Sequence, residues 1–174
     1  MKKTTMYLLL AMALSSPAFA AGDKMGSDND FAMKAADGGM AEVQTGQMAA
    51  NKGSDPKIKQ FGQRMVQDHG TANKELKSIA SKDNISLPQS VSDKHKSAAD
   101  KLAKLSGKDF DNEYAQMMVK DHEEDVALFQ KEANSGSNPE LKAFAQKTLP
   151  TLQEHLRMAQ QLPGASGSDH SNSH

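Results

Sequence analysis

Hydrophobic and polar positions alternate along most of this chain with the period of an α-helix. In four long stretches an apolar residue recurs every three or four positions, as expected when one face of a helix is buried. These stretches are residues 30–51, 56–82, 109–134 and 139–161. The sequence has no stretch with the sustained alternation and β-branched residues of a strand. The pattern therefore predicts an all-α protein.

Two of the predicted helices begin in the same way. Asp55 and Asn138 each supply an N-cap acceptor, and a proline follows each of them at the first helical position, where no N–H is needed. The two signals are 83 residues apart. The same offset aligns further pairs without a gap: Phe31 with Tyr114, Glu42 with Asp125, Asn51 with Asn134, and Phe61 with Phe144. The sequence thus contains two copies of one helical hairpin.

The segment that joins the two copies, residues 83–108, contains a short helical stretch from Asp93 to about Leu105. It is long enough to run down the side of a bundle. Two helical hairpins with a long connection form the ferritin-like arrangement. We therefore expect a ferritin-like four-helix bundle with a short extra helix in the connection.

The first twenty residues have the order of a secretory signal peptide. Lys2 and Lys3 are followed by an apolar run over residues 6–14, and an A-x-A pattern ends at Ala20. A membrane-spanning helix needs about 20 apolar residues, so this run is too short to remain as an anchor. We expect cleavage after Ala20 and a periplasmic or extracellular location.

The rest of the chain forms one domain between two polar ends. Residues 21–29 are expected to be a flexible leader, residues 30–162 the bundle, and residues 163–174 a disordered tail. The tail contains His170 and His174, which we interpret as solvated residues of a polar segment. No segment after residue 20 is apolar enough to span a membrane.

Composition excludes several functions. The formal net charge is −1, and it becomes −3 without Lys2 and Lys3. The sequence lacks the basic stripe with interleaved aromatics that is typical of nucleic-acid binding. It has no cysteine, so thiolate chemistry and disulfides are excluded. We find neither a glycine-rich phosphate loop nor a G-x-S-x-G motif, and therefore assign no catalytic residue.

Each long helix places an ionisable residue on its apolar face. At a rise of about 1.5 Å per residue, all of these residues fall in the middle part of the bundle. A buried polar group without a partner is destabilising, by about 2–7 kcal/mol, so these side chains must contact one another, a water molecule or a metal ion. They are Glu42 on the first helix, His69 on the second, His122 and Asp125 on the third, and His155 on the fourth.

Two adjacent glycines, Gly38 and Gly39, precede Glu42. Inside a helix each is unfavourable by about 1 kcal/mol relative to alanine. They indicate a close helix approach, room for a group beside Glu42, or a break in the helix.

Three neutral imidazoles with one or two carboxylates suit a single divalent ion of zinc, iron, manganese or copper. The metal hypothesis uses His69, His122, His155 and Glu42 as ligands, with Asp125 as a fifth ligand or a partner of the ligands. The alternative is a buried hydrogen-bond network that only fixes the helix register. A dinuclear oxygen-activating site needs Glu-x-x-His pairs, but Val66 and Leu152 stand three residues before His69 and His155.

The same residues resemble a known family: bacterial exported ferritin-like domains of unknown function, often labelled as outer-membrane proteins. The similarity covers about residues 30–160. It rests on Asp30-Phe31 with Gly38-Gly39 and Glu42-Val43, on Met65 to His69, on Phe110-Asp111 through Tyr114 to Met118–His122, and on Leu149-Pro150 through Glu154-His155-Leu156. The resemblance implies the bundle and export, and it implies no activity.

The leading interpretation is therefore a non-catalytic periplasmic binding protein or envelope-stress protein whose core cluster can hold one metal ion. Two alternatives stay open. One is a metal-dependent oxidoreductase, and the other is an interaction module that presents its helix faces to envelope proteins.

Overall fold

The computed structural model describes residues 19–166, with side chains from residue 26 onward. This part of the chain forms five helices and no strand: α1 (Phe19–Lys52), α2 (Pro56–Lys82), α3 (Asp93–Ala103), α4 (Gly107–Ser135) and α5 (Pro139–Ala159). The predicted all-α class is confirmed. Most of the predicted signal peptide, up to residue 18, and the end of the predicted tail, residues 167–174, lie outside the described residues.

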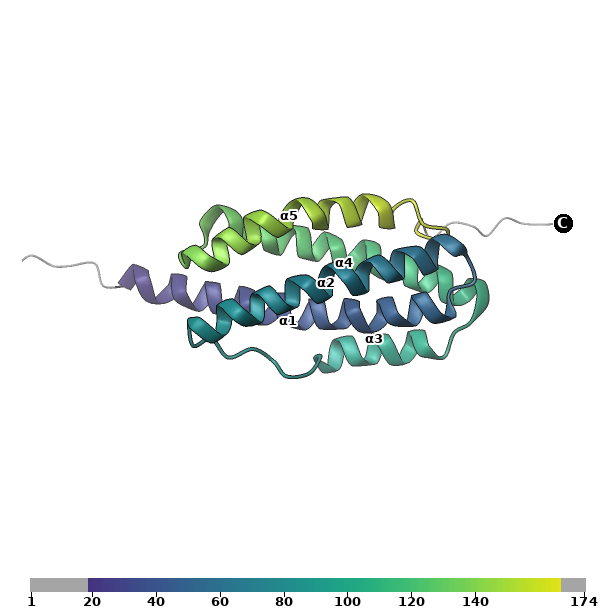
Figure 1. The fold of residues 1–174 in the computed structure, drawn as a ribbon, viewed down its shortest axis with the longest axis horizontal. Coiled ribbons are helices and arrows are strands. Elements are labelled where there is room, and N and C mark those ends of the chain that lie inside the picture. The colour runs from purple at the N-terminus through teal and green to yellow at the C-terminus, as the bar shows by residue number, and fades with distance from the viewer. Residues whose placement is uncertain (1–18, 167–174) are drawn as a thin grey trace, which may run out of the picture.

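The helices form a four-helix bundle from two hairpins (Figure 1). α1 packs mainly against α2, and α4 packs mainly against α5. Across the bundle α1 contacts α4 and α2 contacts α5, while α3 lies against α1 and α4. The two repeated hairpins and the short helix in their connection are thus confirmed.

The two predicted helix starts are capped as the sequence indicates. The Asp55 carboxylate accepts a hydrogen bond from the N–H of Lys57 at 2.7 Å. The Asn138 side chain accepts hydrogen bonds from the N–H groups of Glu140 and Leu141, at 2.9 and 3.0 Å. These bonds satisfy N–H groups of the first turn that have no partner within the helix.

Each hairpin turn is also held by an aspartate from the other hairpin. On α4, Asp111 accepts hydrogen bonds from the N–H groups of Ser54 and Asp55, both at 2.9 Å. On α1, Asp28 accepts them from the N–H groups of Ser137 and Asn138, at 3.1 and 2.7 Å. Asp28 and Asp111 are themselves 83 residues apart, so this reciprocal contact is part of the repeat.

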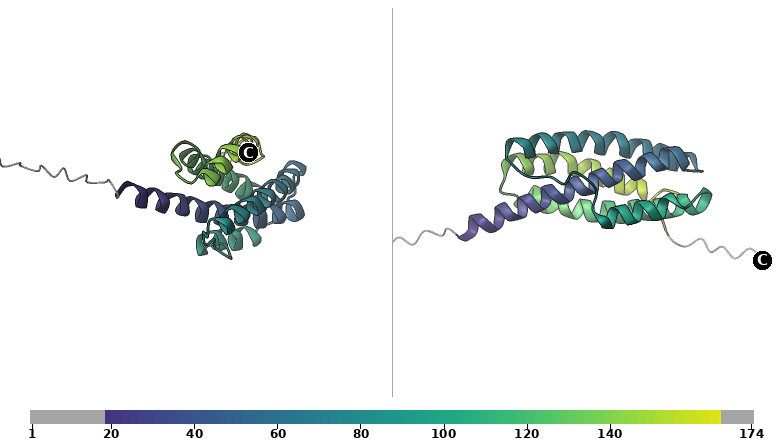
Figure 2. Two further views of the ribbon diagram at one scale, coloured as in Figure 1. Left: turned by 60° about the vertical axis from the view of Figure 1, so that its left-hand side comes forward. Right: turned by 90° about the horizontal axis from the view of Figure 1, so that it is seen from below.

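The helix α1 begins earlier than the sequence analysis expects. It starts at Phe19 and so includes residues 21–29, the expected flexible leader. The reason is Asp28, which is only 4% exposed because it binds the α4–α5 turn. Figure 2 shows this first part of α1 projecting beyond the rest of the bundle. At the C-terminal end of the bundle, the side chain of Gln116 on α4 donates a hydrogen bond to the carbonyl of Gly164 at 3.1 Å. The first residues of the expected tail therefore pack against α4.

The glycine pair does not break α1. A Cβ atom at Gly39 would overlap the side-chain amide of Asn73 on α2. A similar close approach lies further along, where a Cβ at Gly62 would stand 2.6 Å from the carbonyl oxygen of Gly46. The backbones of α1 and α2 therefore approach closely at Gly46 and Gly62, whereas at Gly39 the missing side chain leaves the space that the Asn73 amide occupies.

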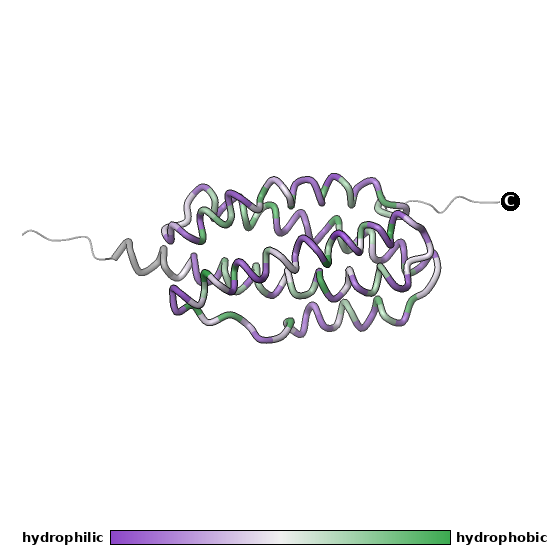
Figure 3. Tube along the Cα trace, viewed as in Figure 1, coloured by the Kyte–Doolittle hydropathy of each residue, from purple (hydrophilic) through white to green (hydrophobic). Residues whose placement is uncertain are grey.

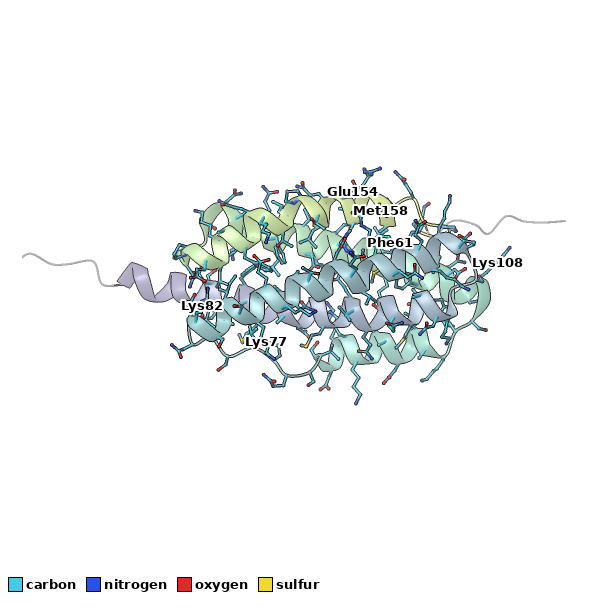
Figure 4. The ribbon with its side chains drawn as sticks, in the orientation of Figure 1. Phe61, Lys77, Lys82, Lys108, Glu154 and Met158 are labelled. Atoms are coloured by element: carbon cyan, nitrogen blue, oxygen red, sulfur yellow. The ribbon has the colours of Figure 1, made fainter. Side chains whose placement is uncertain are left out.

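The apolar core has two parts. One includes Phe31, Leu76, Phe129 and Phe144, and the other includes Phe61, Met65, Phe110, Tyr114 and Met118. In Figure 4, Phe61 lies between the helices, whereas Lys82 and Lys108 lie at the surface. Figure 3 shows hydrophilic residues recurring along every described helix. Accordingly, none of the described helices is long and apolar enough to cross a membrane.

Candidate metal centre

Three histidine side chains meet in the middle of the bundle, each from a different helix. His69 on α2, His122 on α4 and His155 on α5 are 5%, 0% and 0% exposed. Their ring centroids are 5.3–5.5 Å apart. One ring nitrogen from each residue lies within 4.8 Å of the other two. A tetrahedral ion with bonds of about 2.1 Å holds its ligand atoms about 3.4 Å apart, so small ring rotations would close this group around one ion.

Each imidazole has one nitrogen next to an acceptor. His122 Nδ1 donates to the carbonyl oxygen of Met118 at 2.8 Å. His155 Nε2 donates to Asp68 Oδ2 on α2 at 2.8 Å. His69 Nδ1 lies 2.8 Å from Glu42 Oε2. The Met118 carbonyl and Asp68 fix the tautomer and orientation of the His122 and His155 rings, as the partners of metal-binding histidines usually do, while His69 contacts Glu42 without a hydrogen bond.

The second nitrogen of each ring forms no hydrogen bond. Within the part of the chain that the structure describes, His69 Nε2, His122 Nε2 and His155 Nδ1 are buried and have no hydrogen-bond partner. When the first nitrogen carries the proton, the second has a free lone pair. The cluster therefore presents three unprotonated nitrogens without partners.

Glu42 on α1 adds a carboxylate to this group. It is 2% exposed, and its Oε1 lies 3.4 Å from His122 Nε2. Burial raises the pKa of Glu42 to about 7, although nearby His122 opposes the shift. Asp125 on α4 lies next to Glu42, and burial followed by the charge of Glu42 raises its pKa well above the usual range. Burial thus favours the protonated form of both carboxyl groups.

Burial acts on the histidines in the opposite direction. It lowers the pKa of His122 and of His155 to about 4, and it also lowers the pKa of His69. All three imidazoles are therefore neutral at physiological pH. A neutral imidazole is the form that binds a metal ion.

The structure thus brings together the residues that the sequence analysis selected. His69, His122 and His155 share one centre, Glu42 contacts two of them, and Asp125 lies beside Glu42 rather than among the ring nitrogens. The Met118 carbonyl was not expected from the sequence. Asp68 immediately precedes His69, and the sequence left open whether it is a solvated flank or an acceptor next to the ligands; it is the acceptor of His155. Asp68 contacts a histidine 87 residues away, and no spacing in the sequence indicates such a contact.

Residues 13–162 match a family described as a domain of unknown function, DUF4142. The chain belongs to this family. The expectation of a family without an assigned activity is therefore confirmed. Among curated proteins, none matches the sequence.

Several solved structures share the fold. A DUF305 fragment from Deinococcus radiodurans has a TM-score of 0.68 at 10% identity, over 78% of this chain and 93% of that one. A secreted DUF305 protein from Streptomyces coelicolor has a TM-score of 0.66 at 16% identity, over 84% and 98%. CopM in its Cu(I)-bound form has a TM-score of 0.64 at 18% identity, over 77% and 93%. At these identities the similarity shows the helical bundle alone.

Proposed function

We propose that this protein is exported and binds one transition metal ion at the buried cluster of His69, His122, His155 and Glu42. The observation that carries the proposal is the set of three buried ring nitrogens without a partner, each on a ring whose other nitrogen lies next to an acceptor. In a purely structural hydrogen-bond network these nitrogens would accept from donors. A buried acceptor left without a partner is unfavourable by about 1–3 kcal/mol, and a metal ion would satisfy all three together.

The carboxylates complete the proposed site. Glu42 is the fourth ligand, because its Oε1 already lies beside the free nitrogen of His122. Asp125 is the partner of Glu42, and the proton that Glu42 gives up when the ion binds is released to solvent. Asp68 and the Met118 carbonyl hold the rings of His155 and His122 in place.

Copper is the first metal to test. The donors are imidazole nitrogen and carboxylate oxygen, which suit zinc, iron, manganese and Cu(II), and among divalent ions of the first transition row Cu(II) binds such sites most tightly. CopM, which has the same fold, is described in Cu(I)-bound and Cu(II)-bound forms, and this adds support for copper.

The proposed role is binding rather than catalysis. The residues three positions before His69 and His155 are Val66 and Leu152, so the helices lack the carboxylates of a dinuclear oxygen-activating centre. The proposed location is the periplasm, after removal of residues 1–20. The signal-peptide pattern supports this location, and so does the neighbouring structure described as a secreted protein. Envelope proteins are the partners that this location offers.

The test is metal binding by protein purified without a histidine tag. Titration calorimetry with Cu(II) and Zn(II), checked by elemental analysis after dialysis, should give one ion per chain. His122→Asn should weaken binding by about a hundredfold or more, because it removes a ligand. The matched control, His174→Asn in the C-terminal tail, should bind as the wild type does. Absence of binding after incubation with each of the four candidate metals, or equal affinity of a folded His122→Asn and the control, would contradict the proposal.

A further inference from the structure

A pocket of about 430 Å³ lies between α1, α3 and α4. Glu42 and Asp125 line its inner part, and Gly38, Lys94, Asp121 and Glu124 are among its other residues. Glu42 is 2% exposed, and its carboxyl group lies beside that of Asp125. The pocket thus ends on a buried carboxyl group that also contacts two of the three clustered histidines.

We propose that this pocket is the access route by which the metal ion reaches the histidine cluster, and that Glu42 transfers the ion from the pocket to the imidazoles. The proposal rests on the proposed function. The geometry of Glu42 supports it, since Oε1 lies 3.4 Å from His122 Nε2 and Oε2 lies 2.8 Å from His69 Nδ1. An ion bound to Oε1 is therefore already next to the free nitrogen of His122.

The charges of the pocket favour a cation. Lys94 is paired with Glu124 at 3.2 Å, and His95 lies 3.1 Å from Asp37. Lys34, the other lysine of the lining, is paired with Asp30 at 2.8 Å. Within the described residues, Asp121, Asp125 and Glu42 form no ion pair with a lysine or arginine, although burial favours the protonated forms of Asp125 and Glu42 until an ion displaces the proton. A concave site with an excess of acidic groups raises the local concentration of cations and their rate of association.

Gly38 keeps the pocket open. A Cβ atom there would stand 3.5 Å from Asp125 Oδ1, which is an ordinary contact, so close packing does not require this glycine. Its neighbour Gly39 differs, because a side chain there would overlap Asn73. The lack of a side chain at Gly38 leaves space inside the pocket, and a longer side chain would occupy that space.

The main experiment compares Gly38→Leu with Gly70→Leu in the full chain. Gly70 is also inside a helix, and a Cβ atom there meets nothing within 4 Å, so both variants gain the same helix propensity. The rate of Cu(II) uptake is measured by stopped-flow quenching of tyrosine fluorescence, since the sequence has no tryptophan. Gly38→Leu should take up the ion about tenfold more slowly, while its affinity at equilibrium stays unchanged, because the route is blocked and the ligands are intact. Gly70→Leu should behave as the wild type.

A second pair of variants tests the charge of the route and does not depend on a leucine being tolerated. Lys94→Gln removes a positive charge from the pocket and should speed uptake about threefold at low salt, with the gain lost at high salt. Lys101→Gln is the control on the same helix, because Lys101 pairs with Glu113 at 2.7 Å and is not part of the pocket lining.

The outcomes separate the two proposals. If the variants bind the ion normally but Gly38→Leu matches Gly70→Leu in rate, or Lys94→Gln matches Lys101→Gln, the access route is wrong and the metal site stands. If the wild type binds no ion at equilibrium, the proposed function fails and the route fails with it.

Discussion

The two hairpins of the bundle share the residues that build their helices and turns, but they differ at the positions of the three histidines. At the offset of 83 residues, Asp28 corresponds to Asp111 and Glu42 to Asp125, and each pair has a similar place in both hairpins. The histidines have no such counterparts. The residues equivalent to His69, His122 and His155 are Leu152, Gly39 and Ala72. The repeated residues build the bundle, and the proposed chemistry comes from positions where the repeat is broken.

The environment of the equivalent positions shows the contrast. Gly39, Ala72 and Leu152 line a space of about 10 Å³ together with Phe129 and Phe144, and Glu42, His69 and Asp125 line it as well. The equivalent positions therefore adjoin the candidate site, but they bring no polar side chain to it, whereas the histidines bring three buried nitrogens without partners. Glu42 and Asp125, which do follow the repeat, lie next to each other near the centre.

The strongest test of this contrast replaces a histidine by the residue at its equivalent position. His69→Leu introduces the side chain found at Leu152, which fits a buried position of similar size. Metal affinity should fall by about a hundredfold or more, and the metal-free protein should stay folded because a polar group with an unsatisfied nitrogen is replaced by an apolar one. Titration calorimetry and thermal unfolding provide the two measurements. The control is Leu152→Met, a swap of similar volume that should leave affinity unchanged. Wild-type affinity in His69→Leu would exclude His69 as a ligand.

A second test concerns a feature that both hairpins share, the aspartate that binds the turn of the opposite hairpin. Asp111→Ala and Asp28→Ala should each lower the free energy of unfolding by about 1–3 kcal/mol, since each leaves partly buried backbone N–H groups of the other hairpin without an acceptor. Urea unfolding measures the change. The control is Asp30→Ala, also on α1, where the carboxylate forms an exposed pair with Lys34 and the effect should stay within about 0.5 kcal/mol. If Asp28→Ala unfolds like the control, the contact of α1 with the α4–α5 turn is not stabilising.

A smaller effect is expected in the pH dependence of metal affinity, which distinguishes the contribution of the Glu42 carboxylate from that of the histidines. The pKa of Glu42 is raised to about 7, so below this pH the metal must displace a proton, and affinity should fall about tenfold per pH unit. The pKa values of His122 and His155 are lowered to about 4, so these rings should not compete for protons above pH 5. In Glu42→Gln the affinity should therefore be lower and should depend much less on pH between 5 and 8 than it does in the wild type. A fall of tenfold or more per pH unit below pH 6.5 in this variant would mean that the histidines titrate normally.

Much of the fold was predictable because its signals are local. The N-cap and proline before α2 and α5 fix where these helices begin, and the structure places both starts at the predicted residues, Pro56 and Pro139. The start of α1 was not predictable in this way. It depends on Asp28 contacting the α4–α5 turn, 109 and 110 residues further along the chain, and residues 21–29 by themselves have the composition of a loop.

The candidate site also has one part that local sequence signals predict and one part that depends on contacts between distant residues. Helical periodicity puts Glu42, His69, His122 and His155 on inward faces, and their depths along the helices bring them to the same level. Which nitrogen of each ring stays free depends on partners that periodicity cannot reveal. From its place before His69, Asp68 could be a solvated flank or an acceptor next to the ligands, and only the bundle shows that it reaches the ring of His155 on α5.

The central claim is that three imidazoles of different helices bind one ion. A crystal structure of the copper-loaded protein, with anomalous scattering recorded at the copper edge, tests it most directly. The account predicts one peak among His69 Nε2, His122 Nε2 and His155 Nδ1, about 2.0–2.1 Å from each nitrogen, with Glu42 as the fourth ligand. A metal-loaded crystal whose anomalous peaks lie only elsewhere, for example at His95 with Asp37 or at the tail histidines, would contradict it.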